Sequence, residues 1–224
     1  MIAASEGTGQ VLAEAFMYRH HPQTKLIKEM IDNGRLGTIT TIRGAFHFAM
    51  SNPEVNVRMK PELGGGSMWD VGVYPMSYCQ FLMGDTPEWV IADQYIGADG
   101  VDVTFAGQMH YANGVMAQFT CGFREPFHTM IQVVGTEGRI WLKRPFVSVE
   151  QAKPVFYDRD NKREKIRVPK KELYLGEVED MHAAILDGKP QYLTLAETRN
   201  HVKTTLALYE SAQTGQPIII DRHE

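Results

Sequence analysis

Two residues that can move protons and hold hydroxyl groups, Asp70 and Tyr74, lie four positions apart directly after the run Gly64-Gly65-Gly66. If this segment is helical, residues four apart share one face, so the carboxylate and the phenol can meet a ligand together. A phenol can pass a proton to or from a substrate hydroxyl, and a carboxylate can orient that hydroxyl through a charge-assisted hydrogen bond. However, an aspartate in a first helical turn also favours the helix dipole, and a helical tyrosine is commonly a core residue. The spacing therefore leaves a functional and a structural interpretation open.

The eight histidines raise the question of a metal site. Three pairings approach ligand spacing, namely His20-His21, Glu179-x-x-His182 and Glu197-x-x-x-His201. No second matching set completes a site of three or four ligands, so we expect no metal. The cluster Arg19-His20-His21 follows an apolar run, a place where a pocket often opens, although solvated loop residues would explain it equally well.

The glycine run could cradle a phosphate, because backbone N–H groups at a helix start attract anions. The sequence contains neither GxGxxG nor GxxxxGK[ST], so it shows no recognisable seat for a nucleotide. We therefore predict no cofactor-binding residues, and close packing of the backbone is the favoured explanation for the glycines.

These candidates depend on a helix predicted over about residues 68–83, in which Pro75 predicts a kink or a shortened first segment. The clearest pattern is a β-hairpin, with alternating apolar residues over 103–111 and 115–123 around Asn113-Gly114. Further strands are predicted over residues 10–19, 38–50, 130–134, 139–142, 147–149, 155–157, 165–168 and 217–220. Further helices are predicted over about 26–33, from about 177 to Gly188, and from the capping box Thr194-x-x-Glu197 to about 214. The sequence thus predicts one α+β domain over residues 1–224.

Composition excludes several classes of protein. The 224 residues carry 23 basic and 27 acidic side chains, a net charge of −4, which argues against nucleic-acid or anionic-membrane partners. There is no run of eighteen apolar residues and no signal peptide in the first fifteen positions. Cys79 and Cys121 lie in apolar segments without a CxxC spacing, so we interpret them as core thiols and expect a reducing, cytoplasmic location.

Four segments together resemble one family of oxidoreductases. They are AEAFMYRHHPQ (13–23), RMKPELGGGSMWDVGVYP (58–75), VVGTEGRIWL (133–142) and SAQTGQPIII (211–220). In this order they are similar to the C-terminal substrate and dimerisation domain of the glucose-fructose oxidoreductase, inositol dehydrogenase and MocA family. The resemblance implies an open, mostly antiparallel β-sheet with helices packed on one face. It also implies a homodimer or homotetramer through the sheet face, with Met109, Phe119, Phe123 and Trp141 as candidate contacts.

The same resemblance implies a function for individual residues. Family members bind NAD or NADP in an N-terminal Rossmann domain that also supplies a catalytic lysine, and this sequence shows neither. Tyr74 would be the acid or base beside that lysine, and Asp70 would hold the substrate hydroxyl. Five residues would bind the substrate: Tyr18, Arg19, His20 and, more weakly supported, His47 and Arg58.

The expected function is therefore the substrate-binding, oligomerising domain of an NAD(P)-dependent oxidoreductase acting on a small sugar, polyol or related hydroxyl compound. The chain alone should bind no cofactor and be redox-inactive. Two alternatives stay open, a stand-alone carbohydrate-binding or scaffold module without cofactor, and a purely structural assembly protein.

Overall fold

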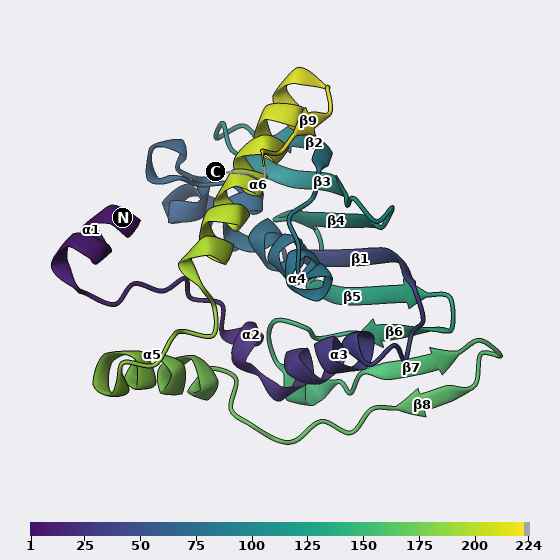
Figure 1. Ribbon diagram of the computed structural model, residues 1–224. Helices are drawn as coiled ribbons and strands as arrows, with labels where there is room; N and C mark the ends of the chain where they lie inside the picture. The colour runs from purple at the N-terminus through teal and green to yellow at the C-terminus, as the bar shows by residue number, and fades with distance from the viewer. Residues whose placement is uncertain (222–224) are drawn as a thin grey trace.

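The computed structural model describes residues 1–221 and shows a nine-stranded sheet with helices on one face (Figure 1). The strands are β1 (Ile39–His47), β2 (Trp89–Ile96), β3 (Asp102–His110), β4 (Met116–Gly122), β5 (His128–Gly135), β6 (Gly138–Leu142), β7 (Val155–Asp158), β8 (Arg163–Lys165) and β9 (Ile218–Ile219). The helices are α1 (Ile2–Thr8), α2 (Met17–His20), α3 (Pro22–Asp32), α4 (Val73–Met83), α5 (Leu175–Asp187) and α6 (Leu195–Thr214). This arrangement confirms the predicted α+β class.

The sheet is open and mostly antiparallel, with the order β8-β7-β6-β5-β1-β4-β3-β2-β9. Only β1 and β4 pair in parallel, and every other neighbouring pair in this sheet is antiparallel. The predicted hairpin is confirmed as β3 and β4, in which Gln108 pairs with Gln118. Gly114 in its turn has φ +82°, a conformation that glycine adopts without strain.

Helices α3, α4 and α6 lie across one face of the sheet (Figure 1). We call this the covered face and the other the open face. At the centre of the covered face, α4 approaches β1 over Gly44, where an added Cβ would lie 2.6 Å from Cβ of Pro75. A glycine is required there because any side chain would push the helix away from the strand. The close approach fixes the distance between β1 and the helix that carries Tyr74.

The helix predicted over 68–83 begins with a π-helical turn, η4 (Met68–Gly72), and becomes regular α-helix at Val73. Pro75 is the third residue of α4, so the irregularity predicted for this segment takes the form of the π turn before the proline. Proline supplies no backbone N–H, and a wider turn before it is one way to accommodate the loss. Before this helix, the predicted loop contains three short 3₁₀ turns, η1 (Pro53–Val55), η2 (Val57–Met59) and η3 (Pro61–Leu63).

Two predicted strands are wrong. Residues 10–16 have no regular structure and Met17–His20 is α2, because Phe16, Met17 and Tyr18 bury their side chains under the helices instead of pairing with a strand. Residues 147–149 form a turn with Ser148 at φ +49°, which leads into η5 (Val149–Gln151). The strand predicted over 165–168 lies earlier, at β8.

The four residues predicted to contact a second subunit do not all lie on the same face of the sheet. Met109, Phe119 and Phe123 are buried, and Phe119 lies with Gly107 on the side where Leu208 of α6 packs, so these three predictions are wrong. Trp141 pairs with Gln132, which in turn pairs with Arg43, and these side chains lie on the open face.

Both free thiols are buried as predicted. Among residues 1–221, no helix has the length and apolarity that crossing a membrane would require.

Candidate functional site

The start of the α4 helix presents Asp70 and Tyr74 to one side, as the four-residue spacing predicts. Asp70 lies in η4 and Tyr74 in the first turn of α4, and both side chains are partly buried. The charge of Asp70 raises the pKa of Tyr74, so the two groups are close enough to interact electrostatically. The carboxylate and the phenol therefore form one site.

Arg58 joins this site from the loop of 3₁₀ turns. Its Nε lies 2.6 Å from Oδ2 of Asp70, and the Asp70 side chain is 21 % exposed. Burial raises the pKa of Asp70, and the hydrogen bond and positive charge of Arg58 act in the opposite direction. The guanidinium thus supports an ionised carboxylate in a place that would otherwise favour the neutral acid.

Tyr74 stands against an aromatic cluster. Its ring centroid lies 5.4–5.9 Å from those of Phe16, Tyr18, Phe46 and Phe146. Burial is the largest influence on its pKa and raises it, and the charge of Asp70 raises it further. Arg58 lowers the pKa only in part, so the phenol keeps its proton at neutral pH and is able to donate it.

Two further residues reach the site from a distant part of the sequence. Tyr174, just before α5, and Glu177, in its first turn, both raise the pKa of Tyr74. Glu177 has a buried Oε1 atom without a hydrogen-bond partner, and burial raises the pKa of this carboxyl. The sequence predicts only that a helix begins near Glu177. No local signal connects it with a tyrosine 103 positions earlier, since only the tertiary fold brings them together.

Tyr18 and Arg19 do not face a surface that a substrate could reach. Tyr18 is fully buried behind Tyr74 and its hydroxyl lies 2.7 Å from Oγ of Ser77. Arg19 is 1 % exposed, with its Nη2 2.8 Å from Oε1 of Glu197 and its guanidinium 3.9 Å from the ring centre of Phe81. Both residues hold α2 against the neighbouring helices, so they support the site from behind.

The two histidines predicted to bind substrate are in different places. His20 is buried beside Tyr192 and lines a 280 Å³ cavity that Glu177 also lines, so it lies next to the site. His47 lies on the open face with its Nε2 2.8 Å from Oγ1 of Thr120. The sheet therefore separates His47 from Tyr74, because Phe46, the residue before it, contacts Tyr74 on the covered face.

The glycine run serves close packing, as the favoured explanation predicts. Gly64 ends η3 with φ +74°, an added Cβ at Gly65 would lie 2.5 Å from the Arg58 carbonyl oxygen, and one at Gly66 would lie 2.1 Å from Oδ1 of Asp102. Close packing thus accounts for Gly65 and Gly66, and the left-handed turn accounts for Gly64. Within residues 1–221, no three His, Cys, Asp or Glu side chains come together in a way that could hold a metal ion.

The open sheet backed by helices, with a carboxylate and a phenol at the start of one helix, agrees with the arrangement that the family resemblance implies. The family model of the GFO/IDH/MocA C-terminal domain matches residues 24–141, and the chain belongs to this family.

Named relatives agree with this assignment. D-xylose 1-dehydrogenase (NADP(+)) 2 of Haloferax volcanii is 31% identical, over 96% of this chain and 66% of its own length. The fold is that of aldose-aldose oxidoreductase from Caulobacter crescentus, with a TM-score of 0.87 at 19% identity over 98% of this chain and 67% of that one. A 3-ketoreductase from Actinomadura kijaniata, in complex with NADP and TDP-benzene, gives a TM-score of 0.86 at 25% identity over 94% and 65% of the two chains. The chain thus spans about two thirds of the length of these relatives.

Proposed function

We propose that this chain is the substrate-binding domain of an NAD(P)-dependent oxidoreductase that acts on a hydroxyl or carbonyl group of a small sugar or polyol. The observation that carries the proposal is the ion pair of Arg58 with Asp70 beside the protonated phenol of Tyr74. The names of the relatives, a xylose dehydrogenase and a ketoreductase, support the substrate class and the nicotinamide cofactor.

In this proposal the chain handles the substrate and its proton. Asp70, kept ionised by Arg58, accepts a hydrogen bond from a substrate hydroxyl and fixes the orientation of the sugar. Tyr74 donates its proton to the carbonyl oxygen when the substrate is reduced. Burial keeps the phenol protonated at neutral pH, but a raised pKa makes it a weaker acid, so a neighbouring cation such as the lysine of the family would have to lower that pKa for fast transfer. No residue of this chain is assigned to the cofactor, whose nicotinamide would carry the hydride in the complete enzyme.

Binding of a panel of aldoses and polyols to the purified chain, followed by calorimetry or NMR, tests this proposal. We expect the wild-type chain to bind at least one member, D-xylose first among them. Asp70→Asn should weaken the binding about 10–100-fold, because hydrogen bonds to a charged group contribute about 1.5–3 kcal/mol. Tyr74→Phe should weaken it about 2–10-fold, since it removes one neutral hydrogen bond.

Matched controls lie away from the site. Asp160→Asn, in the turn between β7 and β8, and Tyr95→Phe, on β2, make the same chemical changes at exposed side chains and should leave the affinity unchanged. If no sugar of the panel binds, or if the control pair has the same effect as the site pair, the substrate-binding proposal is wrong.

A second measurement separates this proposal from a stand-alone carbohydrate module. A nicotinamide-binding domain of about 100–150 residues adds roughly 11–16 kDa. We expect the native polypeptide in its source cells to exceed 25.3 kDa by that amount. We also expect the 224-residue chain alone to show no sugar turnover with NAD or NADP. A native mass of 25.3 kDa, or turnover by the chain alone, would contradict the proposal.

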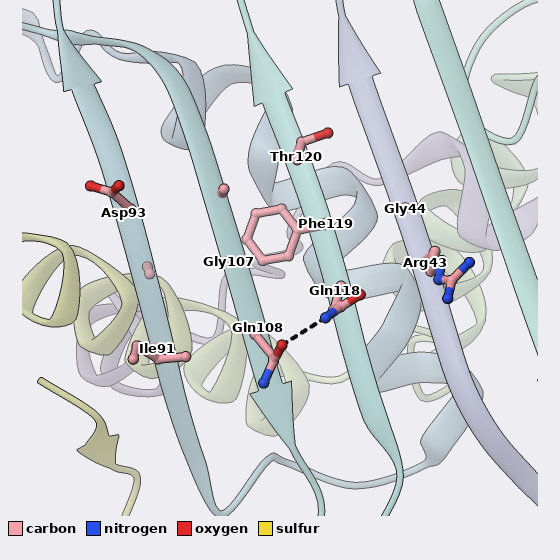
Figure 2. A pocket seen from close by; sticks show the side chains of 11 residues that line it. Arg43, Gly44, Ile91, Asp93, Gly107, Gln108, Gln118, Phe119 and Thr120 are labelled. Atoms are coloured by element: carbon pink, nitrogen blue, oxygen red, sulfur yellow. Dashed lines mark hydrogen bonds between the residues drawn. The ribbon is translucent and has the colours of Figure 1, made fainter. Parts of the chain in front are cut away.

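We also propose that the open face joins copies of this chain into a homodimer or homotetramer. A groove of about 530 Å³ crosses β1, β4, β3 and β2 on this face. Figure 2 shows Arg43 on one side of it and Asp93 on the other. Trp141 adds a large aromatic side chain to the same face. A two-fold axis would place opposite charges of two copies near each other, since every contact in such an interface occurs twice.

Sedimentation equilibrium tests the self-association. The wild-type chain should be dimeric or larger at micromolar concentration, and Trp141→Glu should shift it to monomer without unfolding it. A matched change on the surface of α5, Ile185→Glu, should leave the assembly intact, because Ile185 is exposed and distant from the sheet. A monomeric wild-type chain would rule this proposal out.

A further inference from the structure

A buried carboxylate lies at the start of the helix that carries the site. Asp102, the first residue of β3, is 3 % exposed and accepts three hydrogen bonds. Its Oδ2 accepts from Oγ of Ser67 at 2.7 Å and from the backbone N–H of Met68 at 2.8 Å. Its Oδ1 accepts from the hydroxyl of Tyr209 at 2.8 Å. One side chain thus ties together β3, the first turn of the site helix and α6.

Gly66 connects this carboxylate with both members of the ion pair. Its N–H donates to the carbonyl oxygen of Arg58 at 2.9 Å, and its own carbonyl accepts from the N–H of Asp70 at 3.2 Å. The residue has φ +122°, and the space beside its Cα is filled by the Asp102 carboxylate. Asp102 packs against Gly66, and the backbone of Gly66 is hydrogen-bonded to both Arg58 and Asp70. A shift of the Asp102 carboxylate would therefore be transmitted to both residues through Gly66.

We propose that Asp102 is a positioning residue for the Arg58–Asp70 pair, acting through Met68 and Gly66 without touching substrate. The sugar-affinity measurement assumes the proposed function, whereas the other measurements below do not depend on it. Two hydrogen bonds to one oxygen atom fix the first turn of a helix that begins in the wider π geometry. Without this acceptor the turn has no side-chain cap from another element, and the carboxylate of Asp70 loses its fixed distance from the guanidinium.

The alternative to a positioning role is that Asp102 only stabilises the fold. The two roles differ in what they predict for an asparagine. In Asp102→Asn the amide oxygen can accept from Ser67 and Met68, and the NH₂ group can donate to the Tyr209 oxygen, so all three hydrogen bonds persist without the charge. In Asp102→Ala all three are lost. A positioning role predicts that asparagine rescues the site.

The experiment compares these two variants in the full 224-residue chain by three readouts: backbone amide exchange over residues 68–74, the pKa of Asp70 by carboxyl NMR, and sugar affinity. For Asp102→Ala we expect amide exchange to accelerate at least about ten-fold, because the helix start opens locally. The pKa of Asp70 should shift measurably, and sugar affinity should fall about ten-fold or more. Asp102→Asn should stay within about three-fold of wild type in exchange and affinity.

Val133→Ala is the control for general destabilisation. Val133 is fully buried in β5, and its truncation weakens the core without contacting the start of the helix. It should leave the pKa of Asp70 and the sugar affinity unchanged. If Asp102→Ala unfolds, Ser67→Ala replaces it, because it removes one of the two hydrogen bonds to Oδ2 that fix the first turn. The decisive readouts for that variant are again the exchange rates and the pKa of Asp70.

The outcomes separate the two proposals. If the wild-type chain binds no sugar, the proposed function fails, but amide exchange and the pKa of Asp70 still decide the role of Asp102. If Asp102→Ala, or Ser67→Ala in its place, leaves the exchange rates and the pKa of Asp70 as in wild type, the positioning role is wrong. Equal effects from Val133→Ala and the Asp102 variant would likewise overturn it.

Discussion

The two faces of the sheet hold charged residues in opposite ways. On the covered face, Asp70 is half enclosed and paired with Arg58, and Asp102 is buried with all its hydrogen bonds formed within the protein. At the centre of the open face, Arg43 has neither a hydrogen-bond nor an ion-pair partner among residues 1–221 and borders the groove in Figure 2. Fixed, partly desolvated charges suit chemistry on a small molecule, whereas uncommitted charges on a broad surface suit association with another surface.

The contrast arises from the alternation of a single strand. In β1, Arg43 faces outward, Gly44 faces α4, and two residues later Phe46 contacts the ring of Tyr74. Successive side chains of a strand point to opposite faces, so adjacent positions have unrelated roles. Substitutions at neighbouring residues of β1 therefore test whether the two faces contribute differently to the free energy of unfolding.

The largest effect is expected at Gly44. In Gly44→Ala the new methyl group would lie 2.6 Å from Cβ of Pro75 and 3.1 Å from Cδ1 of Ile131, so α4 has to move. Overpacking of this kind lowers the free energy of unfolding by roughly 1–3 kcal/mol. Arg43→Ala, one residue earlier, should change it by at most about 0.5 kcal/mol. Urea unfolding of both variants measures the difference, and equal effects would show that the covered face is not tightly packed at this point.

The sequence predicts the covered face better than the site on it. The hairpin around Asn113-Gly114 and the capping box of α6 are both confirmed, because local turn and cap chemistry determines them. Both hydrogen bonds of that box form, between Thr194 and Glu197. Asp70 and Tyr74 are predicted together because four residues on one helix are a local relation.

What the sequence cannot predict is non-local. The apolar residues around Tyr18 resemble a buried strand, yet they pack under helices that come from other parts of the chain. Periodicity alone does not distinguish a buried strand from a short buried helix. Glu177 and Asp102 lie near the site only in the folded chain. Their neighbours in the sequence give no sign of the residues that they contact. The sequence does not show on which face of the sheet His47 lies, because a shift of one residue in the strand register would move its side chain to the other face.

The smallest effect is a pH dependence that arises from two buried histidines, of which His20 lies next to the site. His20 and His21 are almost fully buried, and burial lowers the pKa of both below the ordinary value of 6.5. Because the unfolded chain then takes up protons at a higher pH than the folded chain, stability is complete above pH 6.5 and falls as the pH drops below it. Each unit by which a pKa is lowered corresponds to about 1.4 kcal/mol at most.

Urea unfolding at pH 7.5 and at lower pH measures this loss of stability, and histidine NMR titration assigns it to individual rings.

Burial also raises the pKa of Asp70 and Asp102 above 3.8, and this acts in the opposite direction. Between pH 3.8 and their folded pKa values the folded state takes up protons before the unfolded state does, so the protein gains stability as the pH falls. The stability curve should therefore decline below pH 6.5 and flatten in the more acidic range where the two carboxylates titrate. If His20 and His21 titrate at 6.5 or above in the folded chain, burial does not dominate their pKa values, and the predicted loss of stability below pH 6.5 is wrong.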